Sequence, residues 1–188
     1  MWLEQSWITI QQEFSDLGNV EDITRIVVRL MVAMILGGML GYERESVGAS
    51  AGLRTHMLVS LGSAMFVLIP LQAGMEVSDL SRVLQGVTAG IGFLGAGAIL
   101  KQTDKSDIKG LTTAASVWLT AAVGIAAGMG REATAVLSAL FALAILEILR
   151  IMPKGGREQR RIALAGEPDQ QRSAAKDESY QETNVSRQ

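Results

Sequence analysis

The residues best suited to chemistry lie close together in the stretch GYERESVGASAGLRTH, residues 41–56. This stretch contains the polar residues Glu43, Arg44, Glu45, Arg54, Thr55 and His56. Opposite charges gathered at a helix junction can bind a polar ligand, a proton or a loop of another protein. His56 is the only histidine of the chain, and histidine is the side chain whose charge most readily changes near neutral pH. The stretch therefore predicts a ligand or partner site that could also sense acidity.

A second group of acidic residues follows in the sequence KQTDKSDIKG, residues 101–110. Asp104 and Asp107 could combine with Glu43 and Glu45 into a carboxylate cluster that suits hydrated Mg²⁺, which prefers a few carboxylates and retained waters. Asp107 could equally cap the helix that follows. The pattern is compatible with a magnesium site and does not require one.

Both polar stretches alternate with segments that are long and apolar enough to cross a bilayer. Hydrophobic residues make up 48% of the 188-residue chain, which indicates a membrane protein. A transmembrane helix needs about 20 mostly apolar residues. Five windows qualify: 23–42, 55–74, 83–101, 111–129 and 133–151. We therefore expect an all-α, polytopic membrane bundle of about five transmembrane helices, spanning residues 23–152.

The two ends of the chain differ from this central part. Residues 1–22 lack the features of a cleaved signal peptide, and their apolar residues Leu3, Trp7, Ile10, Phe14 and Leu17 follow helical spacing. We expect an interfacial helix here, although a helix packed on the ends of the bundle fits the same pattern. Residues 153–188 contain few large apolar side chains. They are expected to form a disordered cytoplasmic tail.

The distribution of basic residues predicts the orientation of the spans. If the N-terminus lies outside, ten lysines and arginines close to the spans fall on the inner side: Arg44, Arg54, Lys101, Lys105, Lys109, Arg150, Lys154, Arg157, Arg160 and Arg161. The outer side then carries only Arg25, Arg29, Arg82 and Arg131, of which Arg25 and Arg29 would reach the interface by snorkelling. Since inner loops are enriched in basic residues, we expect the N-terminus outside and the C-terminus in the cytoplasm.

This orientation leaves three interpretations of the charged stretch. Arg44 and Arg54 could simply anchor an inner loop, with the glutamates pairing to them at the level of the lipid headgroups. Surface ion pairs contribute only about 0 to 1 kcal/mol, so stability gives little reason to gather so many charges. In the second interpretation Arg54 and His56 meet Glu43 and Glu45 to form a ligand or partner site. A proton relay is the third.

Glycines in the predicted spans indicate where helices pack. Gly37 and Gly41, Gly86 and Gly90, and Gly124 and Gly128 form pairs four residues apart, a spacing that lets helix backbones approach closely in lipid. The third span is richest, with the residues Gly90, Gly92, Gly95 and Gly97 in GIGFLGAGAIL. These four glycines could serve packing, a local break that coordinates an ion, or the seam of a homodimer. Thr112 and Thr113 are expected to hydrogen-bond within or between helices.

Four motifs in order give the chain a family resemblance: GYERE, AGLRTHMLVSLGSAMF, AGIGFLGAGAIL and KGLTTAASVWLTAAVGIAAGMG. Together they resemble the membrane domain of the MgtC/SapB family of bacterial proteins over roughly residues 25–150. The resemblance implies an inner-membrane protein linked to growth at low magnesium and, in some pathogens, to survival inside host macrophages. It also implies a role in regulating membrane potential or an ATP-driven membrane complex. Virulence-linked members carry a folded ACT-like domain after the last helix. The polar composition of residues 153–188 does not match such a domain, so we expect this chain to be closer to the shorter, SapB-like members.

No enzyme motif is recognisable, so we expect a non-catalytic protein. The net charge of −2 gives no indication of nucleic-acid binding, and the absence of cysteine excludes thiol catalysis. We expect a regulatory membrane protein that acts in magnesium or ion homeostasis, or on membrane potential, by binding another membrane protein or complex. The alternative is a small oligomeric ion transporter or channel with its site in the glycine-rich third span. No cofactor is expected, apart from the weakly indicated Mg²⁺.

Overall fold

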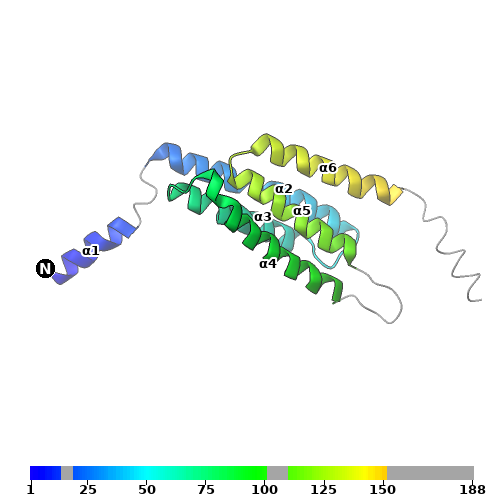
Figure 1. Ribbon diagram of the computed structural model, residues 1–188, viewed down its shortest axis with the longest axis horizontal. Coiled ribbons are helices and arrows are strands. Elements are labelled where there is room, and N and C mark those ends of the chain that lie inside the picture. Colours follow the sequence, from blue (N-terminus) through cyan, green and yellow to red (C-terminus); the bar gives the residue numbers. More distant parts are fainter. Residues whose placement is uncertain (14–18, 101–109, 152–188) are drawn as a thin grey trace, which may run out of the picture. The chain divides into compact units, whose positions relative to one another are not determined.

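The computed structural model describes residues 1–13, 19–100 and 110–151 of the chain (Figure 1). Its regular elements are all helical: α1 (Trp2–Glu13), α2 (Val20–Ser46), α3 (Leu53–Gln72), the short 3₁₀ helix η2 (Val77–Leu80), α4 (Ser81–Leu100), α5 (Leu111–Gly128) and α6 (Glu132–Ile151). The contacts described below lie within one compact unit, Met1–Leu146. The predicted all-α class is confirmed.

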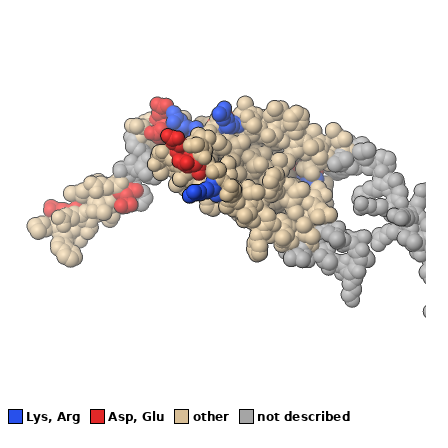
Figure 2. Space-filling model, viewed as in Figure 1, with Lys and Arg blue, Asp and Glu red and all other residues tan. Residues whose placement is uncertain are grey.

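Four of the five predicted spans are confirmed as helices long and apolar enough to cross a membrane. They are Val20–Ser46, Leu53–Gln72, Val77–Ile99 and Leu111–Gly128. The fifth predicted span, 133–151, coincides with α6, and its crossing of the membrane stays a prediction. On the face shown in Figure 2, the sides of the helices are largely uncharged, and charged side chains gather at the end where α2 begins.

The two terminal predictions have different outcomes. α1 forms the expected helix and has no buried residue, while Phe14 and Leu17 of its predicted apolar face lie outside the described residues. Its position at a membrane interface stays a prediction. The predicted tail, 153–188, and the boundary before it also lie outside the part of the chain that the structure describes.

Helix α3 packs between α2 and α5 through glycines on both neighbours. A Cβ added at Gly37 would meet the carbonyl oxygen of His56 at 2.7 Å, and one at Gly41 would meet Leu53 Cα at 2.7 Å. On the other side, Gly124 lies against the backbone of Ser60, and Gly128 lies against the backbone of Ala64. Two of the three glycine pairs therefore form close helix contacts, as small residues do in membrane bundles.

The hydrophobic core is built from small side chains. Its buried members on α2, α3, α5 and α6 are Ala33, Leu36, Leu40, Ala64, Val123, Ala127, Ala135, Ala139 and Ala142. The three α6 alanines recur at spacings of four and three residues, which places them on one helix face. That face brings α6 against the bundle, while large α6 side chains such as Phe141 remain exposed.

Arg29 binds the turn between α5 and α6, whereas the sequence analysis expected it to snorkel to the interface. Its Nη1 donates a hydrogen bond of 3.2 Å to the carbonyl oxygen of Gly128, and its Nε lies 3.9 Å from a carboxylate oxygen of Glu132. A cation near the last carbonyls of a helix is favoured by the helix dipole. Arg25 also has partners on its own helix, since its Nη2 donates to Glu21 over 2.8 Å. Both arginines therefore have partners within the bundle, and their reach to the membrane interface stays a prediction.

Candidate functional site

The last turn of α2 carries the charged part of the predicted site. The span was expected to end at residue 42, but α2 continues to Ser46, so Glu43, Arg44 and Glu45 are helical instead of belonging to a loop. Gly48 then takes a positive φ of 71° and accepts the backbone conformation that the turn requires. The chain reverses within a few residues and enters α3 at Leu53.

Glu43 and Arg44, both in the last turns of α2, form an ion pair with each other. The Nε and Nη2 atoms of Arg44 donate to the two carboxylate oxygens of Glu43, and the side chains are only 11% and 8% exposed. Forked pairing of this kind is stronger than a single charged hydrogen bond. Because the pair is nearly buried, each side chain depends on the other for its counter-charge.

Glu45 has a different role, at the start of α3. Its Oε2 accepts a hydrogen bond of 2.8 Å from the backbone N–H of Leu53, which is one of the donors that a helix N-terminus leaves without an internal partner. The negative charge also suits the positive end of the helix dipole. Glu45 thus links the end of α2 to the beginning of α3.

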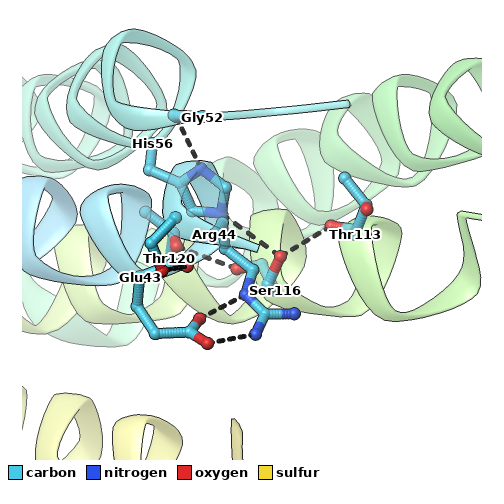
Figure 3. Close-up of polar contacts among 8 residues, drawn as sticks. Glu43, Arg44, Gly52, His56, Thr113, Ser116 and Thr120 are labelled. Atoms are coloured by element: carbon cyan, nitrogen blue, oxygen red, sulfur yellow. Dashed lines mark hydrogen bonds and ion pairs between the residues drawn. The ribbon is translucent and has the colours of Figure 1, made fainter. Parts of the chain in front are cut away.

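His56 lies at the centre of the polar contacts and is completely buried (Figure 3). Its Nδ1 lies 3.0 Å from the carbonyl oxygen of Gly52, and its Nε2 lies 3.2 Å from Ser116 Oγ on α5. The Ser116 hydroxyl also lies 2.8 Å from the carbonyl oxygen of Thr113. The imidazole therefore connects α3 to α5, two helices that are about sixty residues apart in sequence.

Sequence reasoning missed the hydroxyl groups of α5 and α3 that complete this region. Ser116 and Thr120 are buried, and the Thr120 hydroxyl donates to the Ser116 carbonyl over 2.8 Å. Ser60 is also buried and donates to the carbonyl oxygen of Ala33 on α2 over 2.7 Å. Three polar residues of α5 are spaced three and four residues apart: Thr113, Ser116 and Thr120. This spacing could have revealed a polar face of one helix.

Arg54 and Thr55 lie apart from the buried contacts. Arg54 is exposed, and among the described residues it forms no ion pair with Glu43 or Glu45. Arg54 and Thr55 line a cavity of 410 Å³ together with Glu45, Gly52 and Leu53. The structure therefore brings His56 near Glu43 and Arg44, and it places Arg54 on a separate surface beside Glu45.

The remaining predicted residues are divided between exposed and buried positions. Thr112 is exposed and Thr113 is buried. In α4, Gly95 packs on Ala114, whose Cβ would lie 3.4 Å from an added Cβ. At Gly90, Gly92 and Gly97 an added Cβ would meet no described atom within 4 Å. Asp104 and Asp107 lie outside the described residues. Within those residues no group of three or more histidine and acidic side chains could hold a metal ion.

Comparison with known proteins decides the family. A model described as the MgtC family matches residues 30–154, which is most of the chain. The chain belongs to the MgtC family. No solved structure matches this MgtC-family chain.

Three curated relatives illustrate the similarity of this MgtC-family chain to known proteins. Protein SrpB of Synechococcus elongatus is 43% identical over 129 residues, which cover 63% of this chain and 71% of SrpB. The putative magnesium transporter YhiD of Escherichia coli is 39% identical, with 65% of this chain and 59% of YhiD covered. Protein MgtC of Brucella abortus is 41% identical over 118 residues, which cover 63% of this chain and 48% of that protein. The chain thus spans about half of MgtC.

Proposed function

We propose that this MgtC-family chain is a regulatory protein of the bacterial inner membrane. It acts in magnesium or ion homeostasis, without catalysing a reaction, by binding another membrane protein along α4. Its N-terminus lies outside and its C-terminus lies in the cytoplasm, in keeping with the distribution of basic residues. The name of one relative supports the link to magnesium, because YhiD of Escherichia coli is called a putative magnesium transporter.

The observation that carries this proposal is the open space above the glycines of α4. The backbone of α3 packs against the glycines of α2 and α5. By contrast, an added Cβ at Gly86, Gly90, Gly92 or Gly97 would meet no atom of the described residues within 4 Å. Small residues allow close helix approach in lipid, where hydrophobic burial between helices contributes little. The face of α4 therefore has the composition of a helix contact with no occupant from the described part of the chain.

A groove beside these glycines favours a helical occupant. An apolar cavity of 480 Å³ lies between α3 and α4. Its lining includes Leu58, Gly62 and Phe66 from α3 and Gly86 and Gly90 from α4. Its lining thus combines glycines from both helices with larger apolar side chains from α3. A transmembrane helix of a partner could lay its side chains in this groove, as packing ridges of one helix enter the grooves of another.

Growth at low magnesium tests the role of the α4 face. Gly90→Leu fills the open space above α4 and should abolish the ability of the gene to restore growth in a strain that lacks it. Ala144→Leu is the matched control, because Ala144 is an exposed small residue on α6. It should restore growth fully. The proposal fails if the two variants, at equal abundance in the membrane, support growth equally.

Transport is the second candidate, because a relative carries the name of a putative magnesium transporter. In this alternative several copies of α4 would surround an ion path, with Gly92 at its surface. Purified protein in liposomes should then carry a magnesium flux above that of empty vesicles, and Gly92→Leu should remove it. A flux equal to that of empty vesicles would leave partner binding as the better account.

A further inference from the structure

The hydrogen bonds of His56 define where its protons must lie. A backbone carbonyl oxygen can only accept a hydrogen bond, so the 3.0 Å contact between Nδ1 and the Gly52 carbonyl requires a proton on Nδ1. If the ring is neutral, Nε2 is then an acceptor. The geometry therefore selects the neutral tautomer with hydrogen on Nδ1.

The Ser116 hydroxyl has one proton to donate, and two groups lie within hydrogen-bond distance of it. Its Oγ lies 3.2 Å from His56 Nε2 and 2.8 Å from the carbonyl oxygen of Thr113. The carbonyl oxygen is always an acceptor, whereas Nε2 accepts when the ring is neutral and donates when the ring is charged. The hydroxyl can satisfy Nε2 or Thr113, and the charge of the ring decides which.

We propose that His56 is a proton-binding site, and that Ser116 accommodates both of its charge states. In the neutral state the Ser116 hydroxyl donates to Nε2. When a proton from water binds Nε2, the new N–H donates to Ser116 Oγ, and the hydroxyl turns to donate to the Thr113 carbonyl. One proton is gained by the ring, no covalent bond between heavy atoms changes, and the direction of the hydrogen-bond chain reverses.

The surroundings of the ring suit a site of this kind. From α2, the charged side chains that act on His56 are Arg44 and Glu43, whose opposite charges act in opposite senses. From α5, the groups that face this region are the uncharged Thr113, Ser116 and Thr120. On α3 itself, Arg54 is exposed. Burial removes water from the ring, so in either charge state the two ring nitrogens depend on Gly52 and Ser116 for their hydrogen bonds.

Reversal of these hydrogen bonds would make the bonding at the beginning of α5 depend on the charge of the His56 ring on α3. Thr113 lies in the first turn of α5, three residues after Gly110, which adopts a left-handed φ of 95° as the N-cap. Protonation adds a side-chain hydrogen bond to the Thr113 carbonyl, and loss of the proton removes it. This inference is independent of partner binding at α4.

Because the chain contains one histidine, nuclear magnetic resonance of the full-length protein with ¹⁵N-labelled histidine would show His56 alone. The protein would carry a purification tag free of histidine and would be reconstituted in lipid nanodiscs. We expect a neutral ring protonated at Nδ1, which gains a proton at Nε2 as the pH falls while the protein remains folded. A neutral ring protonated at Nε2, or a single charge state throughout the folded range, would overturn the proposal.

Two variants separate the role of Ser116 from general effects of packing. Ser116→Ala should shift the Nε2 resonance, because it removes the bonded hydroxyl, and should leave Nδ1 protonated. Thr120→Ala is the control, since its hydroxyl donates to the Ser116 carbonyl instead of to the ring; it should leave both ring resonances in place. Equal spectra for native protein and Ser116→Ala, in samples of equal helix content, would overturn the assignment of Ser116.

Discussion

Arg44 and Glu43 are neighbours in the sequence, yet they form a forked ion pair in a nearly buried position. Adjacent residues on a helix do not usually face each other. The pair places both charges at the end of α2, close to His56 on α3. Its burial makes the two charges interdependent, and this dependence can be measured.

Removing one charge of this pair should destabilise the protein strongly. Glu43→Gln leaves the Arg44 guanidinium without its counter-charge, which typically costs about 3 to 5 kcal/mol for a buried pair. Glu45→Gln is the matched control on the same turn, and we expect a loss of about 1 kcal/mol because only the link to the N-terminus of α3 weakens. Unfolding of the purified protein by denaturing detergent measures both. Equal stability of the two variants would contradict the interdependence of the two buried charges.

The tight contact between α3 and α5 predicts a contrast between two glycines. An alanine Cβ at Gly124 would overlap the backbone of Ser60, while one at Gly62 would meet no atom of the described residues within 4 Å. Gly124→Ala should therefore lower stability by about 1 to 3 kcal/mol, as overpacking does. Gly62→Ala should be neutral or slightly stabilising. Thermal unfolding in detergent compares them, and a reversed order would contradict the described packing of α3 on α5.

Arg54 should affect function without affecting stability. It is exposed and lines the cavity beside Glu45, and exposed substitutions usually change stability by less than about 0.5 kcal/mol. If this cavity binds a ligand or partner, Arg54→Ala should reduce growth at low magnesium at normal protein abundance. Arg54→Lys keeps the charge but loses the planar fork of donors, so it tests whether charge alone suffices. Normal growth with both variants would remove Arg54 from the site.

The orientation of the chain has a direct test. The excess of basic residues on one side predicts that a reporter fused after Gln188 is active only in its cytoplasmic form. A periplasmic reporter at the same position should be inactive. Activity of the periplasmic reporter alone would contradict the predicted five-span topology, because either the orientation is inverted or α6 does not cross the membrane.

Patterns of single residue types predicted much of the fold. Apolar windows located the helices because a bilayer needs a fixed length of apolar helix, and glycine pairs located the contacts of α2 and α5 with α3 because backbone approach needs the absence of a Cβ. The pair Gly86 and Gly90 follows the same spacing, but an added Cβ there would meet no described atom within 4 Å. Spacing therefore identifies a surface able to pack, while the partner of that surface depends on the folded bundle.

The site was less accessible to prediction, because its contacts join distant parts of the chain. His56 and Ser116 are separated by sixty residues, and Arg29 and Gly128 by ninety-nine. The charged stretch suggested that Arg54 and His56 would act together, but they are two residues apart on α3 and point to different environments, one exposed and one buried. A helix separates such neighbours by about 200° around its axis.

Photo-crosslinking in living membranes tests the central claim, that α4 binds another membrane protein. A photoreactive phenylalanine derivative would replace Phe93 on α4, which is 84% exposed, and in a matched variant Phe141 on α6, which is 62% exposed. We expect the Phe93 variant to form an adduct with a different membrane protein, and the Phe141 variant to form little or none. Equal yields at the two positions, or an α4 adduct that contains only a second copy of this chain, would contradict the claim.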